Sequence, residues 1–399
     1  MSGSNHTAVY YCTTENFILR CLLFAVAMQI LGAMLFQSLP PLNSIYSLLA
    51  YFCGVIVGVT AAKVVSESFH STKKTYIQNM EVSEARIILM AFIAFLPVIP
   101  DALNAIWLST QHHNIRYILL TQPELRLFSP KILMVFGILF SVIATYYLIF
   151  VKDKSKKGIA IVFGLFCLNA MIYVSRTDFV LLFIMYILNS KKLFTIKKLV
   201  MVLLAVIGLG LYTMFIQGRT EVQSISTLLD VILFYSAYFG YPLYLAAKVG
   251  DVFGEISIAY SLFGYPMDVV ETYLSPATGV IAQHLEHIAT PSSIGIDITG
   301  REHIWANVLY PQYGFVMSTL GLCGVFLYYT VISFVICIVS KLNESWAYFW
   351  RVVAFLFIFE SARGAAIGVP ATWFQIIAAF LIVMILARKT ISEKGIANF

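Results

Sequence analysis

Apolar runs of about twenty residues recur from one end of this chain to the other. A helix needs roughly 20 apolar residues to cross the hydrocarbon core of a membrane. Helices are the expected element, because lipid offers no partner for unpaired backbone groups. Of the 399 residues, 60% are hydrophobic and only 12% are charged, which is too little polar surface for a water-soluble domain. The sequence therefore predicts a polytopic membrane protein.

The runs predict an all-α fold with about ten transmembrane helices, in which residues 1–399 form a single membrane domain. Residues 1–16 are polar, and no small-residue cleavage site follows the first apolar run, so we expect that span to be retained. The expected spans are Phe17–Phe36, Ser44–Val65, Arg86–Leu108, Lys131–Val151, Gly158–Val174, Phe179–Asn189, Leu199–Ile216, Tyr313–Ser340, Ala347–Phe359 and Val369–Ala387.

The positions of the 26 lysines and arginines predict the orientation of these spans. Cytoplasmic loops of membrane proteins carry an excess of Lys and Arg. One set of loops holds most of these cations, so this side is predicted to be cytoplasmic, with both termini on it. The net charge of +6 then reflects membrane orientation and does not indicate nucleic-acid binding. The main cytoplasmic cations are Lys73, Lys74, Lys152, Lys154, Lys156, Lys157, Lys191, Lys192, Lys197, Lys198, Lys341, Arg388 and Lys389.

The longest hydrophilic stretch, residues 217–312, falls on the outer side and contains two apolar segments. Val231–Ala247 is rich in tyrosine and contains a proline, which suits a helix at the membrane interface. If Val231–Ala247 crossed the membrane, the second apolar segment, Ile256–Tyr273, would have to cross it in the opposite direction. We favour two interfacial helices, and a pair of membrane crossings is the alternative. Both segments contain Phe-Gly-Tyr-Pro, at 239–242 and 263–266, which is consistent with paired helix breaks or with chance.

The cations on the outer side are mostly arginine, whereas lysine predominates on the cytoplasmic side. A guanidinium group binds phosphate or carboxylate through two parallel hydrogen bonds, which an ammonium group cannot do. This bias favours an anionic ligand on the outer face; snorkelling or pairing with nearby acids is the alternative. The outer cations are Arg116, Arg126, Lys131, Arg176, Arg219, Lys248, Arg301 and Arg363.

Arg176 interrupts the longest apolar run, which extends over residues 159–189. A single helix of that length would measure about 46 Å, and it would place flanking lysine pairs on opposite sides. A hairpin with Arg176 at its outer tip avoids both problems. Its second arm, Phe179–Asn189, is only about 17 Å long, so Arg176 is expected below the outer surface. A semi-buried arginine marks a functional site; an ion pair with Asp178 is the alternative.

Other polar positions give weaker signals. Asp101 follows two prolines near the outer end of its span, a kinked helix end that can line a cavity. Arg363 lies three residues after Glu360, which predicts an i,i+3 ion pair. The cluster Arg301–His303 has acid and base groups just before the membrane re-entry, and a solvated loop is the alternative. His284 and His287 lack a third ligand, so no metal site is predicted.

No nucleotide-binding or hydrolase motif is present, so no cofactor is predicted. Five of the six cysteines lie inside apolar runs without metal-type spacing, and they are expected to act as small packed residues. These are Cys21, Cys53, Cys167, Cys323 and Cys337.

Three short patterns occur in a characteristic order along the chain. Ile115–Tyr117 lies in an outer loop, Val174–Thr177 opens a short span, and Asn307–Gly314 ends the large outer loop. Together with the topology, over roughly residues 100–340, they resemble the Wzy-type O-antigen polymerases, the oligosaccharide repeat-unit polymerases of bacterial envelopes. The chain departs from them at Gln312, where related chains commonly carry an acidic residue before an aromatic-glycine pair. No catalytic carboxylate is therefore expected at that position.

The resemblance implies a metal-independent membrane glycosyltransferase at the periplasmic face of the bacterial inner (cytoplasmic) membrane. It would transfer a growing glycan from undecaprenyl pyrophosphate to a lipid-linked repeat unit. Its partners would be the undecaprenyl-pyrophosphate-linked oligosaccharide, membrane lipid and a chain-length-regulating membrane protein. The expected catalytic residues are Arg176, Arg301, Glu302, His303 and Asp101, and the expected substrate-binding residues are Arg116, Arg219, Tyr238, Tyr241 and Tyr310.

Two other classes of protein are alternatives. An O-antigen ligase, which joins the glycan to the lipid A core, would share the topology and the donor and would differ in its acceptor. A flippase or transporter of lipid-linked oligosaccharides would carry charges at mid-membrane and would usually contain internal repeats. The cations here lie towards the outer side, and no repeat of helices is evident in the sequence.

Overall fold

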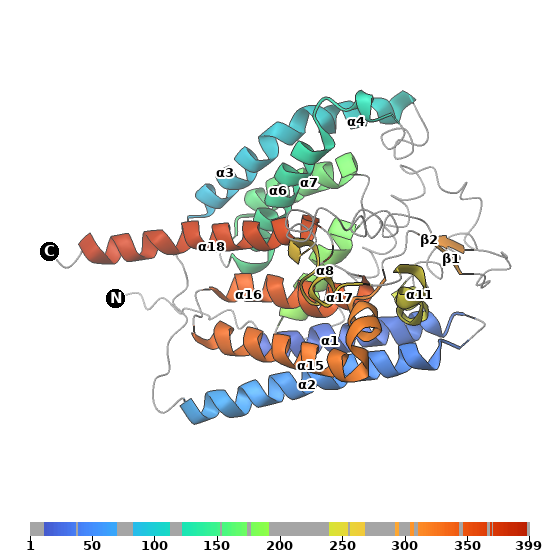
Figure 1. Cartoon of the computed structure of the whole chain (residues 1–399). Helices are drawn as coiled ribbons and strands as arrows, with labels where there is room; N and C mark the ends of the chain where they lie inside the picture. Colours follow the sequence, from blue (N-terminus) through green and yellow to red (C-terminus); the bar gives the residue numbers. More distant parts are fainter. Residues whose placement is uncertain are drawn as a thin grey trace. The chain divides into compact units, whose positions relative to one another are not determined.

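The computed structural model describes residues 12–36, 39–69, 83–111, 122–151, 154–173, 177–190, 239–253, 256–267, 292–294, 304–306, 310–342, 346–364, 368 and 370–396. This part of the chain is helical apart from two three-residue strands, which confirms the predicted helical fold class (Figure 1). The helices group into two compact units, formed by residues 14–78 with 223–377, and by residues 1–13 with 79–222 and 378–399.

Within the described residues, five helices are long and apolar enough to cross a membrane. Each coincides with a predicted span. The remaining predicted spans also coincide with helices, except for Leu199–Ile216, which lies outside the described residues. The five are Thr14–Ala33, Leu42–Ser68, Glu84–Leu108, Ile132–Phe150 and Gln312–Lys341.

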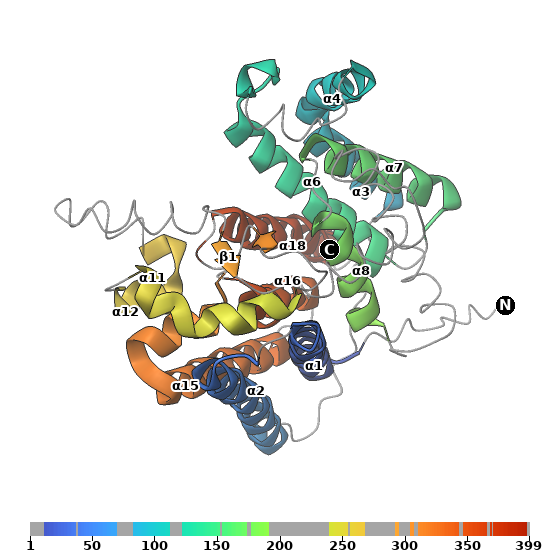
Figure 2. The ribbon, with the colours of Figure 1, turned by 90° about the vertical axis from the view of Figure 1, so that its right-hand side faces the viewer.

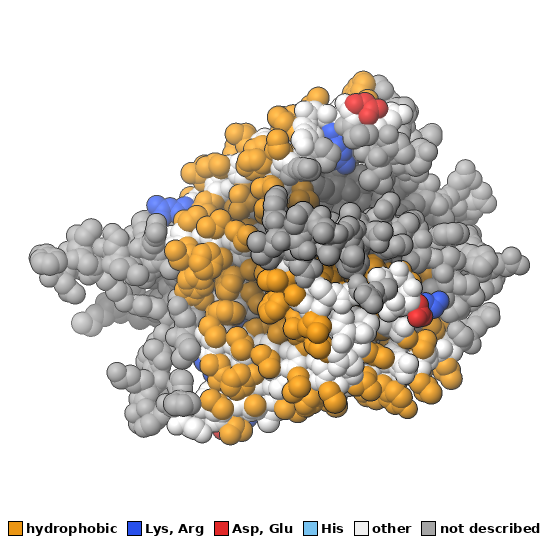
Figure 3. All heavy atoms as spheres, in the orientation of Figure 1, with side chains coloured by type: hydrophobic (Ala, Val, Ile, Leu, Met, Phe, Trp, Pro, Cys, Tyr) orange, Lys and Arg blue, Asp and Glu red, His pale blue; other side chains and the backbone are white. Residues whose placement is uncertain are grey.

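Large apolar side chains lie exposed on the outward faces of these helices. On the helix that begins at Leu42 they include Leu49, Ile56 and Val57, and on the helix that begins at Glu84 they include Phe92 and Ile93. Figure 3 shows hydrophobic side chains gathered over both helices. Surfaces of this kind are unfavourable in water and suit contact with lipid tails.

In the first unit, α2 (Leu42–Phe69) and α15 (Gln312–Leu342) pack side by side (Figures 1 and 2). Two glycines of α2 let the backbones approach. A Cβ atom on Gly54 would lie 2.5 Å from the carbonyl oxygen of Phe326, and one on Gly58 would collide with Ser333 and the Thr330 carbonyl. Small residues spaced four apart allow such close packing between membrane helices.

The two ends of this unit differ in character. At one end the Lys341 ammonium group lies 2.5 Å from the Glu15 carboxylate and 2.5 Å from the Ser66 hydroxyl. These residues belong to the start of α1 (Thr14–Ala33), the end of α2 and the end of α15. Helix α1 therefore runs opposite to the other two, and the start of α15 lies at the far end.

The start of α15 is set off by a kink at Gly321, whose φ of 67° is readily adopted only by glycine. Residues 322–342 alone are long enough to span a bilayer. Short helices pack around the part before the kink. They are η3 (Ala246–Lys248), α11 (Val249–Phe253) and α12 (Ile258–Phe263), and residues 239–245 form a further helix directly before η3.

The two Phe-Gly-Tyr-Pro copies differ in the described residues, because the second contains a helix end and residues 239–242 of the first are helical. Gly264, in the second copy, ends α12 with a φ of 64°. Gly240, in the first copy, lies inside the helix 239–245. A Cβ at Gly240 would collide with the backbone of Gly32 and Ala33, so this glycine serves close packing against α1.

After α15 the chain forms a helix that changes character along its length. It consists of α16 (Ala347–Ala354), a π-helical turn η5 (Phe355–Glu360) and α17 (Ser361–Arg363). Helix α18 (Pro370–Ile396) follows. Both α1 and α15 contact the segment from α16 to α17, which places the π-helical turn in the core of this unit.

The second unit is built around α6 (Pro130–Phe150), which contacts α3, α7 and α8. At Pro97, where the sequence predicts a kink, a 3-10 turn joins two α-helical segments of one span. The two arms of the predicted hairpin correspond to α7, which ends at Tyr173, and to α8, which begins at Thr177. These elements are α3 (Glu84–Phe95), η1 (Leu96–Val98), α4 (Ile99–Gln111), η2 (Pro123–Leu125), α7 (Lys156–Tyr173) and α8 (Thr177–Asn189).

A departure from the purely helical expectation lies within the predicted large loop. Strands β1 (Ser292–Ile294) and β2 (Ile304–Ala306) pair antiparallel, with Ser293 opposite Trp305. The pairing brings together the two ends of the segment that contains Arg301–His303.

Candidate functional site

The π-helical turn η5 lies where three other helices meet. A π-helix is rare and appears mostly as a single turn inside an α-helix, frequently at a functional site. Its carbonyl groups accept hydrogen bonds from buried side chains: the Tyr51 hydroxyl, from α2, donates to the Ile358 carbonyl at 2.8 Å. The Ser361 hydroxyl donates to the Phe357 carbonyl at 2.5 Å and shares a hydrogen bond of 3.1 Å with the Tyr329 hydroxyl of α15. These contacts fix the turn in place.

Gln29 of α1 joins the end of this segment to the start of α15. Its side-chain amide donates a hydrogen bond to the Ala362 carbonyl, and its side-chain oxygen accepts one of 3.0 Å from the Tyr313 hydroxyl. Gln29 is 2% exposed and Tyr313 is fully buried, so neither group reaches solvent. Because a buried carboxamide is costly unless it is paired, this bridge sets the distance between the two helix ends.

Glu360 and Arg363 form a buried ion pair immediately after the π-helical turn. The Arg363 guanidinium lies 3.0 Å from the Glu360 carboxylate, which confirms the predicted i,i+3 pair. The contact uses one nitrogen and one oxygen. The second oxygen of Glu360 and the Nε of Arg363 are buried and have no hydrogen-bond partner among the described residues. Buried polar atoms of this kind call for a bound water, ion or ligand.

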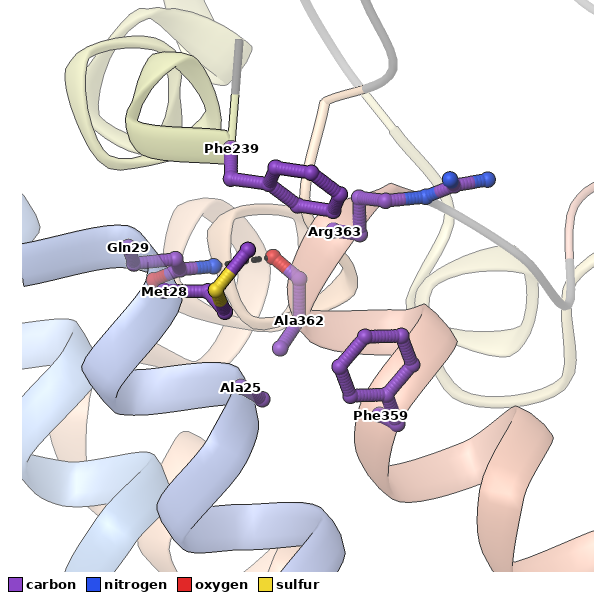
Figure 4. A pocket seen from close by; sticks show the side chains of 7 residues that line it. All are labelled: Ala25, Met28, Gln29, Phe239, Phe359, Ala362 and Arg363. Carbon is purple, nitrogen blue, oxygen red and sulfur yellow. Dashed lines mark hydrogen bonds between the residues drawn. The ribbon is translucent and has the colours of Figure 1, made fainter. Parts of the chain in front are cut away.

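A small cavity of about 10 Å³, room for about one water molecule, adjoins this ion pair. Most of its wall is apolar, and Gln29 and Arg363 are its polar members. Figure 4 shows the Arg363 stem beside the Phe239 ring, with the guanidinium extending away from Gln29. Its volume is far below the roughly 300–1,000 Å³ of a typical ligand pocket. The lining residues are Ala25, Met28, Gln29, Phe239, Phe359, Ala362 and Arg363.

Asp101, a predicted catalytic base, lies in α4 of the second unit and is 4% exposed. Its carboxylate accepts hydrogen bonds from the backbone N–H groups of Leu127 and Phe128, at 2.9 and 3.1 Å. The neighbouring Asn104 amide donates to the Leu125 carbonyl at 2.6 Å. These contacts anchor the segment before α6, and the role of Asp101 as a base stays a prediction.

Two predicted substrate-binding tyrosines are buried in the first unit. Tyr241 is 2% exposed and its ring lies 6.1 Å from that of Phe36. Tyr310 is 3% exposed and its ring meets that of Phe253 edge-on at 5.0 Å. Stacking on a sugar requires an exposed ring face, which neither tyrosine has in this conformation. Their role with sugars stays a prediction.

The other predicted site residues lie outside the described part of the chain. They are Arg116, Arg176, Arg219, Tyr238, Arg301, Glu302 and His303. The sequence reasoning did not single out Gln29, and it treated Glu360 only as an ion-pair partner. The sequence signal that could have identified Gln29 and Glu360 is that each is a strongly polar residue within or at the end of an otherwise apolar run.

In comparisons with known proteins, no family model, no curated protein and no solved structure matches this chain. Function therefore has to be inferred from the residues themselves. A mostly buried arginine with an acidic neighbour is chemically suited to hold an anionic group.

Proposed function

We propose that this chain is an O-antigen polymerase, a membrane glycosyltransferase that transfers a glycan from undecaprenyl pyrophosphate to a lipid-linked repeat unit. The observation that carries this proposal is the position of the Asn307–Gly314 pattern. Its last residues begin α15, and Tyr313 is joined through Gln29 to the backbone beside Arg363. The pattern that resembles the polymerases and a mostly buried arginine thus lie at one end of the same unit.

In this proposal that end faces the periplasm. Lys341, at the opposite end of α15, belongs to the cation-rich side that the positive-inside rule makes cytoplasmic. The proposed topology has about ten spans, with both termini in the cytoplasm and residues 217–312 forming a periplasmic loop. Lipid-linked donors expose their pyrophosphate and glycan at this face, which suits arginines placed just below the surface.

The proposed reaction needs two kinds of side chain. The acceptor hydroxyl attacks the anomeric carbon of the donor while the bond to pyrophosphate breaks. Arginines stabilise the charge on the leaving pyrophosphate, and we assign this role to Arg176, Arg219 and Arg301. A base accepts the proton of the hydroxyl, and Glu302, His303 and Asp101 are the candidates. The donor is already activated, so the proposal includes neither a nucleotide nor a metal.

Deletion of the gene in its own bacterium, followed by gel analysis of lipopolysaccharide, tests this function. A polymerase deletion leaves core lipid with at most one repeat unit, and the wild-type gene on a plasmid restores the ladder of longer chains. An unchanged ladder would contradict the proposal. Core lipid without any repeat unit would also contradict it and would favour a ligase or a flippase.

A further inference from the structure

We propose that the π-helical turn η5 is a register switch: it converts to an α-helical turn, and Arg363 then moves into the place that Ala362 occupies in this structure. An α-helix has 3.6 residues per turn, so a shift by one residue rotates the following residues by about 100° and moves them by about 1.5 Å along the axis. Conversion would therefore change what the Glu360–Arg363 pair faces. The inference concerns the motion of this segment and goes beyond the proposed function.

The hydrogen bonds at the end of the turn distinguish the two registers. The backbone N–H of Ser361 donates to the Leu356 carbonyl, five residues earlier, as in a π-helix. In an α-helix this N–H would donate to the Phe357 carbonyl, four residues earlier. That carbonyl instead accepts a hydrogen bond of 2.5 Å from the Ser361 hydroxyl. One side chain thus holds the acceptor that the α register needs.

Two hydroxyl groups from other helices hold the π register. The Tyr51 hydroxyl of α2 donates to the Ile358 carbonyl at 2.8 Å. The Tyr329 hydroxyl of α15 shares a hydrogen bond of 3.1 Å with the Ser361 hydroxyl. Both tyrosines are fully buried, so water does not compete for these contacts. The register therefore depends on α2 and α15, and a movement of either helix that breaks its contact would favour the α register.

The residues directly after the turn are incompletely satisfied in the π register. One carboxylate oxygen of Glu360 and the Nε of Arg363 are buried without a hydrogen-bond partner among the described residues. A buried polar group without a partner costs free energy. The small cavity beside Phe359 and Ala362 also leaves the packing incomplete. Both features lower the stability of the π register and so narrow the gap to a second state.

The chain after α17 is long enough to absorb a shift by one residue. Residues 364–369 connect Arg363 to the start of α18 at Pro370. A displacement of about 1.5 Å is small beside the reach of such a connection, because each extended residue spans roughly 3.3–3.6 Å. Before the turn, α16 contacts α1 and α15, so we expect the residues after the turn to move.

Disulfide trapping in the purified full-length chain in detergent distinguishes the two registers. Ala25 of α1 and Ala362 line the same small cavity, so Ala25→Cys/Ala362→Cys reports the π register. Ala25→Cys/Arg363→Cys reports the α register. Both reporters also carry Glu360→Gln, because a buried carboxylate without its partner is destabilising, and Cys21→Ala, which removes a thiol one helical turn from Ala25. Copper phenanthroline oxidises the cysteines, and peptide mass spectrometry measures each disulfide.

We expect Ser361→Ala to raise the disulfide yield of the α reporter roughly fivefold and to lower that of the π reporter. Loss of one buried hydrogen bond shifts a two-state equilibrium by about this factor. Tyr51→Phe should act in the same direction. The matched control is Ser340→Ala, which removes a buried hydroxyl that bonds the Cys337 carbonyl at 2.9 Å, at the other end of α15, and should change neither yield.

An α-reporter yield that does not rise in folded Ser361→Ala and Tyr51→Phe would overturn the proposal. A turn with a single register would lose stability in these variants without moving Arg363. Folding is checked by the unfolding transition in SDS. Tyr329→Phe keeps the ring and removes only the hydroxyl that holds Ser361, so it carries the same expectation and decides the question if the other two variants fail to fold.

Discussion

Replacing Gln29 with leucine should destabilise the first unit, because one side chain satisfies two buried groups. The Tyr313 hydroxyl and the Ala362 carbonyl both lose their partner, and these residues are 0% and 1% exposed. A buried polar group left unpaired costs about 1–3 kcal/mol. Hydrogen bonds between membrane helices are weaker, at about 0.6 kcal/mol on average. We therefore expect Gln29→Leu to lower the free energy of unfolding by about 2 kcal/mol.

A double-mutant cycle with Tyr313→Phe isolates this bridge. Each protein is purified and unfolded in mixed micelles with increasing SDS. Because Tyr313→Phe removes the hydroxyl that Gln29→Leu would leave unpaired, the double variant should be more stable than the sum of the single effects by at least about 0.5 kcal/mol. Tyr46→Phe, at a tyrosine that is 49% exposed on α2, should be neutral. Strict additivity of Gln29→Leu and Tyr313→Phe would refute the bridge.

Further predictions concern topology, packing and the hairpin. Reporter fusions after Lys157 should report cytoplasm and fusions within Pro276–Gly300 should report periplasm; a cytoplasmic signal from the latter would reverse the proposed orientation. Gly58→Leu should deplete the protein from membranes on immunoblots, since its side chain would collide with α15, and a normal level would contradict the close packing. Arg176→Ala should leave the protein level normal yet lower polymer synthesis on the order of hundred-fold, and recovery of polymer in Arg176→Ala/Asp178→Ala would defeat its catalytic assignment.

The long helices could be predicted because their signal is local. A run of about twenty apolar residues fixes both the element and its length, and Pro97 breaks its helix because proline supplies no backbone N–H. The π-helical turn gave no such signal. It is held by Tyr51 of α2 and, through Ser361, by Tyr329 of α15. Both tyrosines are distant from the turn in sequence and belong to other helices. Contacts of this kind cannot be seen in a local pattern.

The candidate site shows the same division. The Glu360–Arg363 pair could be predicted because residues three apart share a helix face. The approach of Gln29 depends on how α1 packs, which its apolar sequence does not specify. The cysteines show this limit too. Cys21 and Cys337 are buried as expected and Cys167 is half-buried, but Cys53 and Cys323 are exposed, because an apolar run does not tell which face meets lipid.

Reconstitution of the purified chain in liposomes tests the central claim most directly. The liposomes would contain the undecaprenyl-pyrophosphate-linked repeat unit of the same bacterium and no nucleotide. The account predicts lipid-linked glycans of increasing length, together with release of undecaprenyl pyrophosphate, and the same products in the presence of a chelator of divalent metals. The claim would be contradicted if the repeat units remained single in the presence of folded wild-type protein. It would also be contradicted if, in a parallel sample with added lipid A core, the repeat units were transferred only to that core.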